Sequence, residues 1–280
     1  IKDLPQVINP KSGFIYNANH SPFKSTGNSE NPKEKNYSKT MNYETYDNNR
    51  STRIRNLINS FDTIDYNTFK QIKYDNKLPK PLNYNFLDIN VLWEINPLNY
   101  PKLSDVILNI QNWDMATDSN SVGAANYAVL YYTLINNFKG IKHKKIFDKI
   151  EIIDLVTHTK NHLLEHFGSV NIKLGDFQKL VRGNKEIGIF GLPDVITAMK
   201  GTKYKDGKIK ITHGESYISL VKFKDDKVEI ESIISYGASD NPNSKHYNDQ
   251  MDLYSKFKTK KMSLNKKEVY NRGVRVYNPK

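Results

Sequence analysis

The chain has 280 residues, and its 42 Lys and Arg against 30 Asp and Glu give a formal net charge of +12. It contains no cysteine, which excludes disulfides, Cys-liganded zinc, iron–sulfur clusters and thiol nucleophiles. No apolar run approaches the roughly 18 residues that a membrane-spanning helix needs, so we expect no membrane span. Mean hydropathy is low at −0.68, but 18 Tyr and 12 Phe supply enough large apolar surface to build a core.

Residues 1–48 predict one core strand and a loop. A turn over 9–13 leads into a β-prone run at 14–16, and Pro22 ends this segment. Residues 24–49 are rich in Ser, Asn, Lys and Glu and poor in apolar side chains. A polar stretch of this length in a compact chain is typical of a functional or disordered loop.

Residues 49–168 predict a helical section. Apolar residues recur at helical spacing over 49–61, as at Ile54, Leu57 and Ile58, and again over 66–74 and from 99 to 110. The strongest helical pattern covers 121–139, with small alanines on one side and Tyr131, Leu134 and Phe138 on another. A further long helix is expected over 148–167, ending at Gly168, a typical C-terminal cap.

Residues 169–280 predict a strand-rich section with a final helix. Strands are expected at 208–212, 216–224 and 227–235, the last two joined by a turn at 224–227, and the helix at 247–258. Helices followed by strands, without regular alternation, indicate an α+β fold class.

The positive charge admits two interpretations, a nucleic-acid site or a solvated surface. Lysines gather at 142–145, 256–261 and 266–267. A nucleic-acid site would interleave Arg and aromatic side chains on one surface or carry a recognition module, and no such module is visible. We therefore favour a solvated surface and expect no nucleic-acid partner.

His162, Glu165 and His166 form the pattern H-x-x-E-H, and His158 lies four residues earlier. Histidines at this spacing share a helical face and can gather a metal ion. The same helix also needs an apolar face for packing, and no third ligand is evident downstream. We favour a surface helix and predict no metal and no cofactor.

Asn17 and Asn19 follow the expected strand at a spacing of two residues. One interpretation is that an asparagine amide at a strand end is a fixed hydrogen-bond donor, as an oxyanion hole requires. The other is an Asx turn, in which the side chain only satisfies local backbone groups.

Six segments in order resemble one protein family, the penicillin acylases and acyl-homoserine-lactone acylases, which are N-terminal nucleophile hydrolases. The first is N-P-x-x-G-[FY]-[IV]-x-N-x-N-x-x-P, beginning at Asn9, and the second is R-x-x-R-I, beginning at Arg50. The others are the W-D…S-x-G-A, L-G-D-F…L-V-R-G, G-x-S-[YW] and Y-G-x-S…H-Y-x-D-Q patterns, beginning at Trp113, Leu174, Gly214 and Tyr236. Together they cover nearly the whole chain.

The resemblance implies that residues 1–280 are the C-terminal portion of a penicillin-acylase-like β chain. It implies part of an αββα sandwich, with the rest of the β chain and an α chain from the same precursor as partners. In such enzymes a catalytic Ser begins the β chain, and its free amino group is the general base for attack on an amide carbonyl.

By motif position, Asn19 would be the oxyanion-hole asparagine, and Arg50 would orient Asn19 and tune the amine of the nucleophile. The alternative for Arg50 is a helix-terminal residue paired with Glu44 or Asp47. The His246 to Asp249 run is expected to be structural.

This sequence departs from the family pattern because the chain begins with Ile1, which is not a nucleophile. We therefore expect a truncated or split piece of a larger protein, inactive by itself. Two functional classes remain: part of an acylase acting on a small acyl amide, above all an acyl-homoserine lactone, or a non-catalytic binding or scaffold remnant. By analogy with the family, a periplasmic or secreted location is expected.

Overall fold

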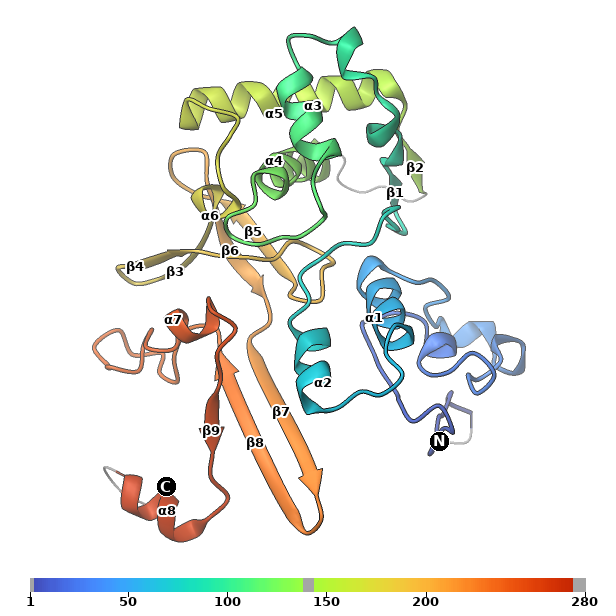
Figure 1. Ribbon diagram of the computed structural model, residues 1–280, viewed down its shortest axis with the longest axis vertical. Helices are drawn as coiled ribbons and strands as arrows, with labels where there is room; N and C mark the ends of the chain where they lie inside the picture. The colour runs from blue at the N-terminus through green and yellow to red at the C-terminus, as the bar shows by residue number, and fades with distance from the viewer. Residues whose placement is uncertain (1–2, 138–143, 274–280) are drawn as a thin grey trace.

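The computed structural model describes residues 3–137 and 144–273, which combine helices with three small sheets (Figure 1). The mixed α and β content agrees with the expected fold class. Four parts of the sequence predictions lie outside the described residues: Ile1, Phe138, the end of the helix at 139, and Lys142.

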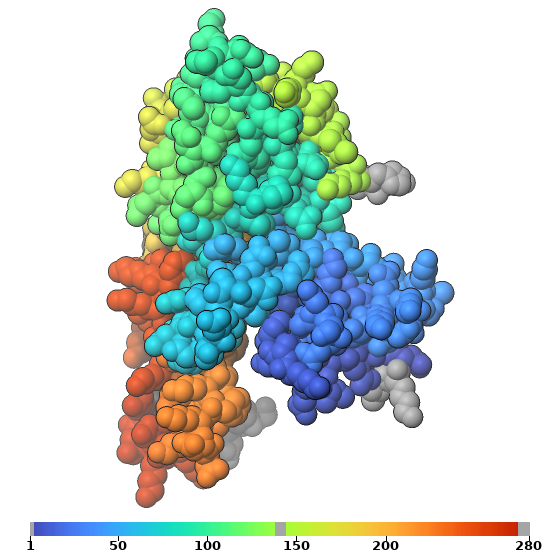
Figure 2. Space-filling view, turned by 45° about the vertical axis from the view of Figure 1, so that its right-hand side comes forward, coloured from blue at the N-terminus to red at the C-terminus, as the bar shows by residue number. Residues whose placement is uncertain are grey.

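The N-terminal segment has no strand at 14–16 among the described residues, so that prediction is wrong. The contact of this segment with the returning chain is too short to form a ladder. Tyr16 N–H donates to the Ser25 carbonyl at 2.9 Å, and Thr26 Oγ1 donates to the Phe14 carbonyl at 2.7 Å. Three short 3-10 turns follow, and Figure 2 shows this segment as a lobe beside the rest of the molecule.

The helices are α1 (Asn49–Asn59), α2 (Tyr66–Lys73), α3 (Ser104–Gln111), α4 (Val122–Asn137), α5 (Lys149–Phe167), α6 (Leu174–Phe177), α7 (Met251–Tyr254) and α8 (Lys266–Arg272). The five helices expected between 49 and 168 are therefore confirmed. Helix α3 begins later than expected because Pro97–Asn99 forms a separate 3-10 turn. Helix α5 ends at Phe167, and its C-cap Gly168 has a left-handed φ of 69°, which glycine adopts readily, while its N–H donates to the Leu164 carbonyl at 3.0 Å.

Helix α4 is the central helix of the larger core. It is buried around most of its circumference, which is why its apolar residues show no single stripe. Helices α3 and α5 and the segment 78–95 pack around it. At its start, Gly123 allows close approach of α3, because a Cβ there would lie 2.7 Å from the Asn109 carbonyl of α3 and would overlap the side chain of Trp113 just after that helix.

The strands are β1 (Leu87–Asp88), β2 (Lys145–Ile146), β3 (Gln178–Arg182), β4 (Lys185–Gly188), β5 (Met199–Lys203), β6 (Ile209–Gly214), β7 (Tyr217–Lys224), β8 (Lys227–Ile234) and β9 (Lys260–Met262). They form one sheet in the order β4-β3-β6-β5, a second in the order β7-β8-β9, and the pair β1-β2. The hairpin β7–β8 confirms the sequence prediction, with Lys224 paired to Lys227 at its turn. The prediction at 208–212 corresponds to β6, whereas strands β1 to β5 and β9 were not predicted.

The expected helix at 247–258 is wrong over most of its length, since only Met251–Tyr254 is helical. The helix ends at Tyr254, and a turn follows in which Phe257 has a left-handed φ of 55° and Lys258 N–H donates to the Leu253 carbonyl at 2.9 Å, as in a Schellman motif. The Phe257 ring packs on Phe190 with centroids 4.1 Å apart. This aromatic contact belongs to a second core between the sheets and α7.

The loop between β4 and β5 runs from the second core back to the N-terminus of α1 (Figure 1). This places a residue of the strand-rich section beside the N-terminal turn that carries Asn19. Of the helices in the described ranges, none is long and apolar enough to cross a bilayer.

We predict that Gly123→Ala destabilises the protein by about 1–3 kcal/mol, because the added Cβ overlaps Trp113 and the Asn109 carbonyl. The measurement is the free energy of unfolding in urea. Asn136→Ala, on the exposed side of the same helix, is the matched control and should be neutral or slightly stabilising. An equally stable Gly123→Ala variant would contradict the close packing of α3 on α4.

Candidate active site

The candidate site is built around the turn at residues 17–20. Asn17 Oδ1 accepts the backbone N–H of Asn19 at 2.8 Å, and Asn19 has a φ of 55°. Asparagine tolerates this left-handed conformation better than most residues. The Asx turn is thus present, but Asn17 makes it. The Asn19 side chain is not used in the turn and is exposed.

The imidazole of His20 stabilises this turn from the buried side. Its Nδ1 accepts the Ala18 N–H at 3.1 Å, so the ring proton lies on Nε2, which donates to the Lys24 carbonyl at 3.0 Å. The ring also stacks on Tyr16, with centroids 4.8 Å apart. Burial lowers the pKa of His20, although the bond to Lys24 opposes this effect. A neutral imidazole with both nitrogens bonded fixes the backbone just before and after Asn19.

The cap of α1 attaches the turn to that helix. Asn48 Oδ1 accepts the Ser51 N–H at 2.8 Å, and Ser51 Oγ accepts the Asn48 N–H at 3.0 Å, which is a reciprocal capping box. The Asn48 amide nitrogen then donates to the carbonyls of Ala18 at 2.7 Å and Asn19 at 3.2 Å. One buried side chain therefore sets both the start of α1 and the position of Asn19.

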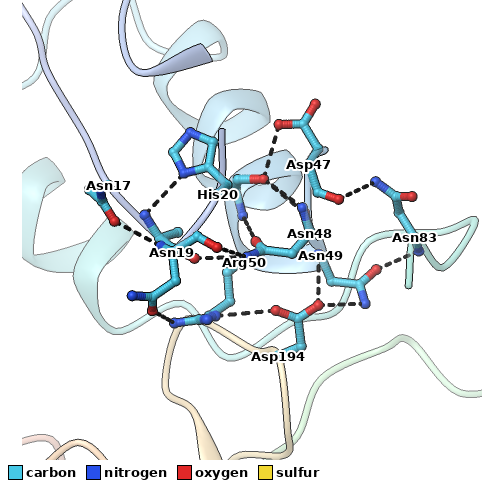
Figure 3. Close-up of polar contacts among 11 residues, drawn as sticks. Asn17, Asn19, His20, Asp47, Asn48, Asn49, Arg50, Asn83 and Asp194 are labelled. Atoms are coloured by element: carbon cyan, nitrogen blue, oxygen red, sulfur yellow. Dashed lines mark hydrogen bonds and ion pairs between the residues drawn. The ribbon is translucent and has the colours of Figure 1, made fainter. Parts of the chain in front are cut away.

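Arg50, in the first turn of α1, fixes the side-chain amide of Asn19 (Figure 3). Arg50 Nη1 donates to Asn19 Oδ1 at 3.2 Å. Because a guanidinium has donors only, the amide oxygen must face Arg50 and the amide nitrogen must point away. Within residues 3–137 and 144–273, Nδ2 of Asn19 has no hydrogen-bond acceptor. It is an exposed, oriented and uncommitted donor.

Asp194, from the loop between β4 and β5, holds Arg50 in turn. Its Oδ1 accepts Arg50 Nε at 3.2 Å, and its Oδ2 accepts the backbone N–H and the side-chain amide of Asn49 at 2.8 and 3.0 Å. The carboxylate thus lies at the positive N-terminal end of α1 and satisfies a free helix N–H. Burial raises the pKa of Asp194, and the bonds from Asn49 and Arg50 lower it in part.

A separate cluster accounts for Asp47. Its carboxylate binds Arg55 and Lys24, each at 2.9 Å. Burial opposes ionisation, but these two cations outweigh it and lower the pKa of Asp47. Arg50 therefore pairs with Asp194 and with neither of the acids, Glu44 and Asp47, that the sequence offered as alternatives.

Glu215, at the junction of β6 and β7, adds a second half-buried acid near the site. It forms an ion pair with Lys73 of α2. Burial raises the pKa of Glu215, while the charges of Lys73 and, more weakly, Arg50 lower it. Among the residues that the structure describes, its Oε2 has no hydrogen-bond partner. The carboxyl group borders a cavity of about 290 Å³ whose other walls include Leu180, Met199 and Tyr236.

The H-x-x-E-H pattern lies on α5 and serves packing. His162 Nε2 bonds the Gly207 carbonyl at 2.7 Å, and the His166 ring covers Gly207. Glu165 and His158 are exposed. In the described part of the chain, no group of three His, Asp or Glu side chains is placed to hold a metal ion.

Sequence reasoning singled out Asn19 and Arg50, and the structure brings them into contact. It missed Asp194, Asn48 and Asn49. Asn48 precedes a helical pattern and is a recognisable N-cap, but nothing in the sequence links Asp194 to a helix that begins 145 residues earlier, at Asn49.

A family model described as penicillin amidase matches residues 1–271. The chain therefore belongs to the penicillin amidase family, which agrees with the resemblance seen in its motifs.

Curated relatives match over shorter segments. The acyl-homoserine lactone acylase PvdQ of Pseudomonas syringae pv. syringae is 34% identical over 87 residues, which is 30% of this chain and 11% of that protein. The enzyme of the same name from Pseudomonas savastanoi pv. phaseolicola is 30% identical over 100 residues, or 35% of this chain and 13% of that protein. The alignments thus cover a small part of these relatives.

A thermostable penicillin G acylase from Alcaligenes faecalis is similar in structure with a TM-score of 0.44 and 11% identity, over 97% of this chain and 58% of that one. At this TM-score the match adds nothing to the family assignment.

The Asp47 cluster predicts an acid-dependent loss of stability. The pKa of Asp47 is lower in the folded state than in the unfolded chain. The ionised carboxylate therefore stabilises the folded state fully when the pH is above its unfolded-state pKa of about 4, and this stabilisation is lost as the pH falls through its folded-state pKa. We expect Asp47→Asn to cost about 1–2 kcal/mol at neutral pH, and the difference from the unsubstituted chain to shrink below about pH 4.

Urea unfolding at a series of pH values measures this difference. Asp225→Asn, at the exposed turn of the β7–β8 hairpin, is the control. A difference that stays constant down to about pH 2 would argue against the ion pairs as its cause.

Proposed function

We propose that this chain is part of an amide-bond hydrolase that cleaves N-acyl substrates. An N-terminal Ser in a part of the enzyme outside this chain is the nucleophile, and its free amino group is the general base, directly or through water. The observation that supports this most is the Asn19 amide, which is held by Arg50 with Nδ2 uncommitted in a member of the penicillin amidase family.

In this proposal Asn19 Nδ2 donates to the oxyanion of the tetrahedral intermediate. Attack on the carbonyl carbon moves charge to the carbonyl oxygen, and a donor already aimed at that position needs no reorganisation during the reaction. Asn19 suits this role because three contacts fix it. Its N–H is bonded to Asn17, its C=O to Asn48 and its Oδ1 to Arg50.

Arg50 has two roles in the proposal. It prevents the side-chain amide of Asn19 from flipping by about 180°, because the flip would place the Nδ2 hydrogens against a guanidinium that has no acceptor. Its positive charge also lowers the pKa of a nearby amine and so favours the neutral base. The guanidinium side chain is 25% exposed, so solvent weakens the second effect more than the first.

The family also suggests what completes the enzyme. We propose that the sheets β4-β3-β6-β5 and β7-β8-β9 belong to an αββα sandwich completed by the rest of the β chain, with an α chain from the same precursor as partner. The proposed domain organisation is one C-terminal β-chain portion over 1–280, with divisions at 48 and 168. Acyl-homoserine lactones are the proposed substrates, and the periplasm or exterior is the proposed location.

The alternative is a binding or scaffold protein of the same family that has lost its chemistry. The hydrolase and the scaffold protein would differ in the coding sequence immediately upstream of this chain. An in-frame stretch with a Gly-Ser processing junction supports the hydrolase, and a complete protein without an N-terminal Ser, Thr or Cys would exclude it.

We predict that residues 1–280 alone do not hydrolyse an N-acyl nitroanilide, because they contain the oxyanion donor without the attacking group. The assay measures released nitroaniline, and the assembled enzyme is the positive control. Turnover by the isolated chain would place a nucleophile within it and contradict the proposal.

In the assembled enzyme, Asn19→Ala should lower kcat by about 10²–10³-fold, as expected for loss of one oxyanion donor. KM should change little, because the bond forms mainly in the transition state. Steady-state kinetics with an acyl-homoserine lactone and an N-acyl nitroanilide measure both constants.

Asn36→Ala, an exposed asparagine in the adjoining loop, is the matched control. Unchanged kcat in a folded Asn19→Ala enzyme would refute the oxyanion role.

A further inference from the structure

We propose that Asp194 is a positioning residue for the proposed amide hydrolysis, because it holds the Arg50 guanidinium in the orientation that fixes the Asn19 amide. This inference rests on the proposed function of Asn19. Asp194 itself bonds Arg50 and Asn49 and not Asn19, so it acts on the reaction only through Arg50.

Two nitrogens of the Arg50 guanidinium have different hydrogen-bond partners. Nε binds Asp194 and Nη1 binds Asn19, each at 3.2 Å. Because the guanidinium is planar and rigid, fixing Nε limits where Nη1 can lie. A partly exposed arginine bonded only to a neutral amide would keep much of its rotamer freedom. The ion pair with Asp194 removes that freedom and leaves Nη1 directed at Asn19 Oδ1.

Asp194 is well suited to impose this orientation because both of its oxygens are occupied. Oδ2 accepts two bonds from Asn49, so the carboxylate cannot rotate to follow Arg50. These bonds also tie it to the residue that precedes Arg50 in α1. The distance between the carboxylate and the start of the Arg50 side chain is therefore set by the helix end.

The loop that carries Asp194 is anchored at both ends. Gly191 N–H donates to the Thr117 carbonyl at 2.9 Å, and Met199 N–H donates to the Leu192 carbonyl at 3.2 Å. Leu192 and Val195 are each 1% exposed and pack in the larger core. Asp194 lies between them with a φ of 63°, a conformation that Asp and Asn adopt more readily than other side chains. Because Leu192 and Val195 are packed in the core, the position of the Asp194 carboxylate at the site is fixed relative to the core.

A second ion pair on the same helix offers a matched comparison. Arg53 donates to Asp75 at 2.9 Å through Nε and 2.6 Å through Nη2. The side chains of Asp75 and Asp194 are 13% and 18% exposed, so the two carboxylates are similarly buried. Arg53 has no bond to the turn at 17–20 in the described residues. Loss of Asp75 should weaken the attachment of α1 without disturbing Asn19.

The test uses the assembled enzyme and an N-acyl nitroanilide. Asp194→Asn keeps the size of the side chain and removes its charge. It should lower kcat by about 10- to 100-fold, the cost of a misplaced catalytic group, while KM changes by less than about twofold. Asp75→Asn should lower Tm to a similar extent and leave kcat unchanged. If Asp194→Asn is too unstable to assay, Asp194→Glu, which keeps the charge but displaces it, should show the same selective loss of kcat.

A double-mutant cycle separates positioning from a structural role. If Asp194 acts through Asn19, then Asn19→Ala/Asp194→Asn should be no slower than Asn19→Ala alone, within about twofold. Multiplied effects, or an unchanged kcat in a folded Asp194→Asn enzyme, would overturn the inference. An unchanged kcat in Asn19→Ala would instead reject the proposed function, and with it the role of Asp194.

Discussion

The guanidinium of Arg50 makes the contact on which the candidate site depends. It joins the turn at 17–20, the start of α1 and the loop between β4 and β5, which come from distant parts of the sequence. An arginine can do this because its donors point in several fixed directions in one plane. A lysine would carry its three donors on one rotating ammonium group and would not hold the amide and the carboxylate in a fixed mutual geometry.

The acids around Arg50 each have their own cationic or helix-end partner. Asp47 forms ion pairs with Arg55 and Lys24, and Glu215 forms one with Lys73. Asp194 forms an ion pair with Arg50 and accepts a backbone N–H at the N-terminus of α1. This division matters because a half-buried charge left unpaired is costly. Because Asp47 is already paired with Arg55 and Lys24, it does not compete for Arg50, and the Arg50 guanidinium remains directed at Asn19. The electrostatics of the surroundings therefore support one geometry of the Asn19 amide.

Much of this could be predicted from the sequence where the signal is local. The helices α1, α4 and α5 and the β7–β8 hairpin follow from periodicity, caps and turn residues. Asn19 and Arg50 could be found because both lie in short motifs. The structure differs where distant contacts decide. Residues 14–16 pair with no strand in the described part of the chain, and the chain turns left-handed soon after α7 at Phe257, whose ring packs on Phe190, 67 residues earlier in the chain. Strands β3 to β5 are short and partly polar, so they carry a weak sequence signal. The contacts of Asp194 with Asn49 and Arg50 arise only when the loop between β4 and β5 folds against α1.

The most direct test of this account is the structure of the assembled enzyme with a phosphonate or boronate bound covalently to its nucleophile as a mimic of the tetrahedral intermediate. The account predicts Asn19 Nδ2 at about 2.7–3.1 Å from the oxyanion mimic, with Arg50 still bonded to Asn19 Oδ1 and Asp194. An oxyanion mimic held by other donors, with the Asn19 amide turned away from it, would contradict the account.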